Sequence, residues 1–379
     1  MVCYHYTIAM KLMGITSGVS GFFTDVLNFF KGRAVLGVDI GTASIKIAEI
    51  SEKSGTLNLT NYGILETKDY LNHPNKAIQT SSLPIEEGES ADLLKMLLGE
   101  MKTKTNLAIA SIPSFASFGT VIDMPLMSRD ETAKAVIFQA PQYIPMPVAE
   151  TLVDWFKVDE FTGDSRQKFQ HIFVIGISKK LIQKYKDMFR EAGLRLVSLE
   201  FDALAATRAL IDDGAEETII VDIGAEETEI FIASKGHLEY VGGTDYSGIH
   251  LTQSVARSLG ITTLRAEELK RRRGLSSEGP ESELSTLTIP FLDVIIQEVN
   301  HVKEVYHRRY GREVKKVMLV GGGANLIGIE KYFVRQTGLI EAQPNIFRKV
   351  SYQLNLEPTL RRLTNEFPTA VGLAERYFA

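Results

Sequence analysis

Two distant segments of the sequence carry the same short motif. Residues 38–42 read Val-Asp-Ile-Gly-Thr, and residues 221–225 read Val-Asp-Ile-Gly-Ala. In both, an aspartate ends an apolar run and precedes a glycine and small or hydroxyl-bearing residues, which predicts a tight hairpin. Glycine lets the backbone approach a phosphate closely, and turn N–H groups and hydroxyls donate to phosphate oxygens. The aspartate is suited to hold a magnesium ion through water, since Mg²⁺ keeps several of its waters.

A third glycine cluster adds to this pattern. Gly321, Gly322 and Gly323 are followed by Ala324, after a predicted strand and before a predicted helix. Backbone without side chains can lie against a base or a ribose there, although a tight strand-to-helix turn has the same composition. An Asp-x-Gly sequence alone is equally typical of an ordinary turn. The three segments together favour a nucleotide site.

Strands and helices must position these segments. Apolar runs predict strands, and apolar residues at helical spacing predict helices. The predicted strands are 34–40, 44–50, 57–65, 107–112, 118–124, 151–158, 171–177, 218–223, 228–233 and 316–320. The predicted helices are 90–101, 178–192, 203–211, 249–259, 266–273, 290–310 and a last helix from 367. Ser90 is the expected N-cap of the first helix, and 72–89 and 275–287 are expected to be loops.

A separate unit is predicted between Pro113 and Leu196, with the order strand, helix, strand, strand, helix. Its first helix follows a capping box, in which Ser128 and Glu131 bond each other's backbone N–H groups. Three prolines between 141 and 147 are expected to end that helix.

Composition narrows the function classes. The 379 residues are 44% hydrophobic and 23% charged, which is typical of a globular protein. The net charge of −5 argues against general nucleic-acid binding. Cys3 is the single cysteine, so no internal disulfide forms and a reducing, cytoplasmic compartment is expected. No apolar run reaches the roughly 20 residues of a membrane span.

Residues 1–33 form an unusual lead. Phenylalanines recur there at helical spacing beside basic residues. Such a helix could lie on an anionic membrane surface or a partner, or could dock on its own domain. Met13 is an alternative start.

The order of these segments resembles that of the actin-like ATPases. Residues 200–206 and 368–374 resemble the two connecting helices that cross at the hinge of that family. The inserted unit, with the sequence 138–147 (Phe-Gln-Ala-Pro-Gln-Tyr-Ile-Pro-Met-Pro), resembles the PilM family of type IV pilus proteins, an FtsA-like branch. The resemblance implies an α/β, actin-like (ribonuclease H-like) two-lobed ATPase fold with an FtsA-type inserted subdomain. It also implies the division 1–33 (lead), 34–115 with 196–215 (first core subdomain), 116–195 (inserted subdomain) and 216–379 (second lobe, with 244–315 its helical upper part and 368–379 crossing back).

The resemblance also implies roles for individual residues. Asp39 and Asp222 would hold Mg²⁺ through water. The residues expected to bind ATP are Asp39, Gly41, Thr42, Ser44, Lys46, Asp222, Gly224, Glu226, Thr228, Glu267, Lys270, Gly321, Gly322, Gly323 and Ala324. Glu200 is the candidate to orient a water, or else caps a helix. Glu226 stands where active family members have smaller residues. The sequence therefore leaves open whether the protein hydrolyses ATP.

The implied function is a cytoplasmic, ATP-binding scaffold at the inner face of the membrane. It would bind the cytoplasmic N-terminal tail of a PilN-like inner-membrane protein in a groove between the first core subdomain and the inserted one. Further interactions stay open. They are contacts with other pilus platform proteins, with the pilus motor ATPase and with the membrane surface, and self-association. The alternatives are an FtsA-like division tether and a small-molecule kinase or ATPase of the same fold.

Overall fold

The first lobe is built on a six-stranded sheet. A computed structural model describes residues 34–66, 87–163, 166–275 and 282–379, so the predicted lead, residues 72–86 of the first predicted loop and residues 276–281 of the second lie outside it. The strands follow the spatial order β14-β3-β2-β1-β4-β8. Their bounds are β1 (Val35–Ile40), β2 (Ser44–Lys53), β3 (Thr56–Glu66), β4 (Leu107–Ile112), β8 (Arg195–Phe201) and β14 (Val350–Ser351). Its helices are α3 (Glu87–Met101), α5 (Lys179–Glu191), α6 (Asp202–Leu210), α11 (Leu360–Glu366) and α12 (Pro368–Glu375).

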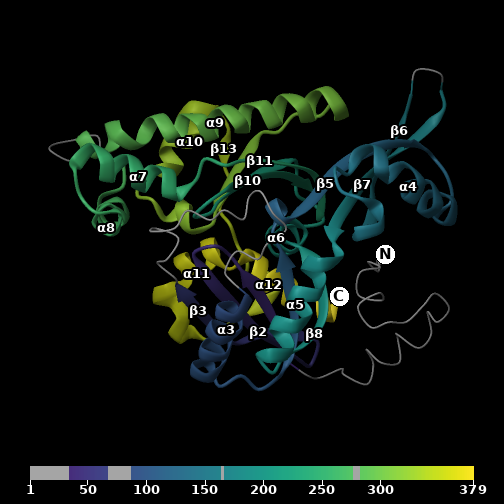
Figure 1. Ribbon diagram of the computed structural model, residues 1–379. Coiled ribbons are helices and arrows are strands. Elements are labelled where there is room, and N and C mark those ends of the chain that lie inside the picture. Colours follow the sequence, from purple (N-terminus) through teal and green to yellow (C-terminus); the bar gives the residue numbers. More distant parts are fainter. Residues whose placement is uncertain (1–33, 67–86, 164–165, 276–281) are drawn as a thin grey trace.

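The second lobe repeats this plan around a five-stranded sheet in the order β11-β10-β9-β12-β13. The strands are β9 (Thr218–Ile223), β10 (Thr228–Ser234), β11 (His237–Thr244), β12 (Lys316–Val320) and β13 (Ile340–Glu341). In each lobe an antiparallel three-stranded meander is extended by a strand parallel to its first strand. The helices are α7 (Gly248–Leu259), α8 (Thr263–Arg273), α9 (Ser282–Tyr310) and α10 (Ile329–Thr337). Figure 1 shows the two lobes stacked, with α9 running along the outer side of the second.

An inserted unit extends to one side of the lobes (Figure 1). Its three strands lie in the order β5-β7-β6. They are β5 (Ser117–Pro125), β6 (Thr151–Thr162) and β7 (Lys168–Ser178), and α4 (Arg129–Tyr143) covers them. The capping box of α4 is confirmed, since Ser128 N donates to Glu131 Oε2 at 3.0 Å and Glu131 N to Ser128 Oγ at 3.4 Å. No helix of the described ranges is long and apolar enough to span a membrane.

Helices α6 and α12 cross each other on the first sheet, and their hydrophobic core continues into the second lobe at Ile220 and Phe231. A Cβ atom on Gly372 of α12 would lie 1.8 Å from the carbonyl oxygen of Ala205 in α6. A Cβ on Gly37 of β1 would lie 1.9 Å from the carbonyl oxygen of Ala370. Only glycine permits these backbone contacts, which explains the small residues of both connecting helices.

Several predicted helix boundaries were wrong. Helix α3 begins at Glu87, so Ser90 lies inside the helix and is not its N-cap. Helix α4 ends at Tyr143, within the predicted proline segment, and contains Pro141 in its last turn. Helix α9 begins at Ser282, before its predicted start, and contains Pro290. Pro290 removes one backbone hydrogen bond, and α9 continues because Thr288 and Leu292 on either side of it are buried. Helix α5, predicted as part of the inserted unit, packs its apolar face into the core of the first lobe instead.

Candidate nucleotide site

The two aspartate-glycine motifs form matching hairpin turns. Gly41 N donates to Ser44 O at 3.0 Å in the β1–β2 turn, and Gly224 N donates to Glu227 O at 3.0 Å in the β9–β10 turn. A Cβ on Gly224 would lie 2.8 Å from Glu227 O, so this turn requires glycine. Residues of both turns line one cavity.

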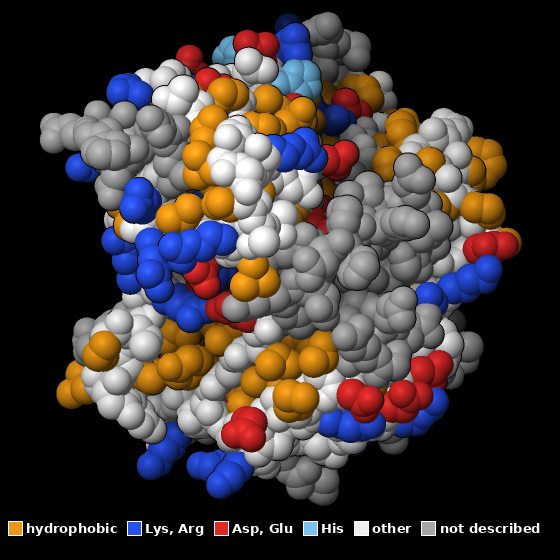
Figure 2. Space-filling view, turned by 60° about the vertical axis from the view of Figure 1, so that its left-hand side comes forward, with side chains coloured by type: hydrophobic (Ala, Val, Ile, Leu, Met, Phe, Trp, Pro, Cys, Tyr) orange, Lys and Arg blue, Asp and Glu red, His pale blue; other side chains and the backbone are white. Residues whose placement is uncertain are grey.

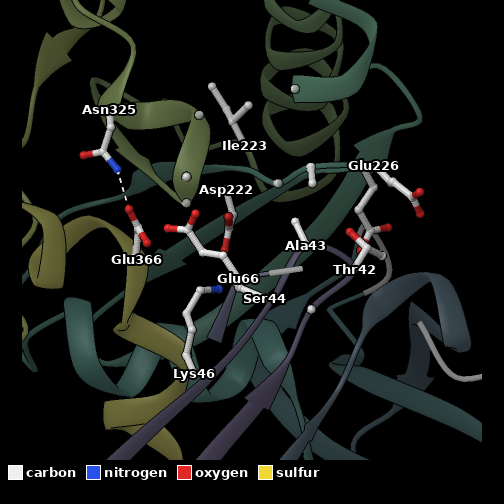
Figure 3. Close-up of a pocket in the computed structure, with 18 of the residues that line it drawn as sticks. Thr42, Ala43, Ser44, Lys46, Glu66, Asp222, Ile223, Glu226, Asn325 and Glu366 are labelled. Atoms are coloured by element: carbon white, nitrogen blue, oxygen red, sulfur yellow. Dashed lines mark hydrogen bonds between the residues drawn. The ribbon is translucent and has the colours of Figure 1, made fainter. Parts of the chain in front are cut away.

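A cavity of about 390 Å³ lies between these turns. Figure 3 shows side chains of both lobes converging on it. The predicted residues that line the cavity are Asp39, Gly41, Thr42, Ser44, Lys46, Asp222, Gly224, Glu226, Glu267, Lys270, Gly321, Gly322 and Gly323. The structure therefore brings together residues that the sequence spreads over nearly 300 positions.

Three predicted residues are not among those that line the cavity. Thr228 is buried, and its hydroxyl donates to Tyr246 O at 2.7 Å. Ala324 packs in the core of the second lobe. Glu200 is bound by Arg208, whose Nη2 and Nη1 lie 2.6 and 2.8 Å from its two oxygens, and by Arg376 at 3.2 Å. These arginines outweigh burial and lower the pKa of Glu200, so its carboxylate joins α6 to the C-terminal segment rather than facing the cavity.

The first hairpin carries its own cation. Lys46 Nζ lies 3.0 Å from Asp39 Oδ2, and the Ser111 hydroxyl donates to Asp39 Oδ1 at 2.9 Å. Burial lowers the pKa of Lys46, but Asp39 and Asp222 more than compensate and raise it overall. Lys46 is therefore an ammonium ion placed between the two aspartates, where a phosphate would also be attracted.

The second hairpin has a carboxylate where the first has this lysine. Asp39 is paired with Lys46 across the strands, and Asp222 is paired in the same way with Glu229. Burial and the Asp39 charge raise the pKa of Asp222 to about 6, although Lys46 opposes this. Burial and Asp202 raise the pKa of Glu229 well above its usual range. Glu229 is buried, and its Oε1 atom has no hydrogen-bond partner.

Sequence reasoning missed five acidic residues of the cavity, which are Glu66, Asp202, Glu227, Glu229 and Glu366. Burial raises the pKa of Asp202 and of Glu227 well above the usual range, with nearby carboxylates adding to the effect. Alignment of the two motifs could have revealed Glu229, since both partners lie seven residues after the aspartate.

These carboxylates fit a hydrated divalent cation. In the described part of the chain, no three His, Cys, Asp or Glu side chains are placed to bind one metal ion directly. The orphan oxygen of Glu229 and the raised pKa of Asp222 indicate that negative charge at this hairpin is uncompensated within the chain. A magnesium ion with its water shell would supply the missing charge and the missing donors.

The cavity is also lined by α8 and the glycine cluster. Lys270 Nζ lies 2.7 Å from Glu267 Oε2 and 2.9 Å from Thr252 Oγ1. Burial raises the pKa of Glu267, but Lys270 and its hydrogen bonds lower it to about 2, so the carboxylate is ionised. Gly321 has φ +82°, and a Cβ there would lie 2.2 Å from Asp222 Oδ1. Bare backbone is thus required beside the second hairpin.

Comparison with known proteins agrees with this architecture. A family model for "Type IV pilus assembly protein PilM" matches residues 37–378. A chain of a PilM-PilN type IV pilus biogenesis complex is similar, with a TM-score of 0.78, 23% identity, and coverage of 91% of this chain and 98% of that one.

Two further solved structures share the fold at lower similarity. Ethanolamine utilization protein EutJ from Carboxydothermus hydrogenoformans has a TM-score of 0.53 and 18% identity over 97% of this chain and 98% of its own. MreB 5 of Spiroplasma citri, bound to AMPPNP, has a TM-score of 0.50 and 16% identity over 82% and 91%. The predicted actin-like fold is confirmed. Because the family model covers almost the whole chain, the protein belongs to the PilM family of type IV pilus assembly proteins.

Proposed function

We propose that this protein binds ATP with Mg²⁺ between its lobes and that the nucleotide state controls binding of a PilN-like protein's cytoplasmic tail. The protein would act at the inner face of the cytoplasmic membrane. One observation carries the nucleotide part of the proposal: two matching aspartate-glycine turns face one cavity from the two lobes. A similar solved structure, that of MreB 5, is bound to AMPPNP, and another is a PilM-PilN complex.

Different residues of the cavity would bind different parts of the nucleotide and its cation. Lys46 would attract the phosphates, while Asp39, Asp222 and Glu229 would hold the waters of a magnesium ion, which supplies positive charge to the phosphates. The glycine cluster and the ion pair of Glu267 with Lys270 would meet the adenosine.

The inserted unit would couple nucleotide binding to partner binding. It continues into β8 and α5 of the first lobe, and it also contacts the second lobe through ion pairs of Asp123 with Arg309 (2.6 Å) and Asp159 with Arg312 (3.0 Å). Closure of the lobes would therefore change the position of the inserted unit relative to them. A nucleotide shifts such an equilibrium only through different affinities for the two arrangements.

A calorimetric titration tests the proposal. The ligand is a peptide copied from the cytoplasmic tail of a PilN-like protein, with a scrambled peptide as control. We expect binding whose affinity changes when Mg²⁺ and ATP are added. Absence of binding in both states would contradict the proposal.

A further inference from the structure

An ion-pair bridge crosses the edge of the nucleotide cavity. Glu66, at the end of β3 in the first lobe, accepts from Arg271 Nη1 of α8 in the second lobe at 3.4 Å. Its other carboxylate oxygen pairs with Arg362 of α11. All three side chains line the cavity, and Figure 3 shows Glu66 projecting into it. The bridge thus joins the lobes beside the space that a nucleotide would occupy.

The bridge is continuous with the ion pair of Glu267 and Lys270 in α8. Arg271 Nε lies 2.7 Å from Glu267 Oε1, the carboxylate that also pairs with Lys270. On the other side, Arg362 Nε lies 3.0 Å from Glu366 Oε1.

Glu366 passes the network on to the glycine cluster. Its Oε1 atom accepts from Asn325 Nδ2 at 2.9 Å, and Asn325 Oδ1 accepts from Asn365 at 3.0 Å. The carbonyl oxygen of Asn365 accepts from Gly321 N at 2.7 Å. Polar contacts therefore run from α8, through Glu66 of the first lobe, to the backbone proposed to meet adenosine.

The surface charge in Figure 2 agrees with an ion-pair bridge, since basic and acidic side chains lie together there. Figure 2 shows Lys and Arg side chains gathered around a few acidic ones, between the upper and the lower half of the molecule. Arg271 of α8 and Arg362 of α11 come from different lobes. They draw the lobes together only if an anion lies between them. Glu66 supplies that anion from within the chain.

We propose that Glu66 is a latch residue, which holds the lobes together over a bound nucleotide and slows its release. This inference rests on the proposed nucleotide binding. The Glu66 bridge adds to the contacts between the lobes at α6, α12 and α11, and it lies at the edge of the cavity. A ligand that contacts both lobes favours the same closed arrangement, so latch and nucleotide reinforce each other.

The size of the effect follows from exposure. The side chains of Glu66, Arg271 and Arg362 are 35%, 56% and 48% exposed. Exposed ion pairs are weak and screened by salt, so loss of the latch should accelerate release about two- to fivefold.

The test is the dissociation rate of a fluorescent ATP analogue with Mg²⁺, chased with excess unlabelled ATP. Glu66→Gln should release the analogue about two- to fivefold faster than wild type, with a weaker dependence on salt. Glu66→Asp, which keeps the charge on a shorter side chain, should lie between the two. Glu268→Gln is the matched control, because it removes an exposed Glu–Arg pair within α8 that does not cross the cavity.

A double-variant cycle shows whether Glu66 acts through the arginine. Glu66→Gln should have little further effect in an Arg271→Gln background, and full, independent effects of both changes would overturn the latch. Unchanged release in Glu66→Gln, with normal binding by wild type, would also overturn the latch alone. Failure of the wild-type protein to bind the analogue would overturn the proposed function and the latch with it.

Discussion

The two hairpins differ at one cross-strand position, and this difference sets the electrostatics of the cavity. The first pairs Asp39 with Lys46, whereas the second pairs Asp222 with Glu229. One aspartate is therefore neutralised within the chain, and the other depends on a cation that arrives from solution. This asymmetry predicts that nucleotide binds together with a divalent cation and that the second hairpin is sensitive to pH.

Asp222→Asn should weaken binding of ATP in the presence of Mg²⁺ by tenfold or more, about 1.4 kcal/mol, while the fold survives. The carboxylate that holds the hydrated cation is lost, and asparagine has nearly the same shape. In the wild type, Asp222 has a pKa of about 6, so it takes up a proton below that pH and binding should weaken from pH 7 to pH 5. Calorimetry checks both results, with the exposed Asp92→Asn of α3 as control. Unchanged affinity would contradict this role.

Glu375 predicts a pH-dependent stability. It is buried, neither carboxylate oxygen has a hydrogen-bond partner, and burial raises its pKa to about 7 although Lys349 and Arg208 oppose this. Because the folded-state pKa lies above the usual 4.5, the folded protein holds the proton more tightly and gains stability as pH falls through 7.

Between pH 8 and pH 6, Glu375 should contribute about 1 kcal/mol to the free energy of unfolding, since one pKa unit corresponds to about 1.36 kcal/mol. Glu375→Gln should remove this contribution, measured by denaturant unfolding at both pH values. Exposed Glu191→Gln is the control. An equal pH dependence in Glu375→Gln and wild type would show that the carboxyl group does not titrate in this range.

At the scale of elements, the crossing of α6 and α12 brings two helix backbones into close contact on the first sheet. Gly372→Ala would place a methyl group 1.8 Å from Ala205 O, so the helices must separate. We expect a loss of about 1–3 kcal/mol of stability or a failure to fold. Thermal unfolding measures the loss, and Gly99→Ala in α3, where no atom lies within 4 Å, should be neutral or slightly stabilising. Equal stability of both variants would contradict the close crossing.

The sequence predicted elements well where local signals and packing agree. Strands β4, β9 and β12 have the predicted bounds, because each is a short apolar run ended by proline or glycine. The starts of α3 and α9 were missed, since α3 begins at Glu87 and α9 at Ser282. In α9, Ser285 and Thr288 are buried although they are polar, so an apolar pattern does not mark this part of the helix. Strand β11 was not predicted, and α10 was predicted only as a helix of unstated bounds after the glycine cluster.

The same contrast between local signals and long-range contacts applies to the site. The glycine turns were visible because their conformation depends on local residues. The Glu66 bridge and the acidic group of Asp202 and Glu229 were not, because they depend on contacts between residues far apart in the sequence. The role expected for Glu200 failed for this reason, since Arg376 reaches it from the other end of the chain.

At the scale of the whole molecule, the inserted unit is attached to both lobes. Arg312 lies at the centre of its contact with the second lobe, where it pairs with Asp159 of the unit and with Glu239 (2.9 Å) and Glu217 (3.3 Å) of the lobe. It also lies over the Tyr306 and Tyr310 rings. This contact would transmit movement of the lobes to the inserted unit.

Arg312→Ala should therefore lower stability by roughly 1–3 kcal/mol, because it leaves partly buried carboxylates without a cation. It should also weaken the effect of nucleotide on tail binding while nucleotide affinity itself stays unchanged. Thermal unfolding and titration of the tail with and without Mg²⁺ and ATP measure the two effects. Exposed Arg308→Ala is the matched control. Full nucleotide dependence in Arg312→Ala would show that the coupling takes another route.

The central claim is that two facing turns hold a nucleotide through a shared cation. Calorimetric titration of the wild-type chain with ATP, once with Mg²⁺ and once with a chelator, tests it most directly. The acidic second hairpin predicts saturable, one-to-one binding with Mg²⁺ and much weaker binding with the chelator. Equal affinity under both conditions, or no binding under either, would contradict the account.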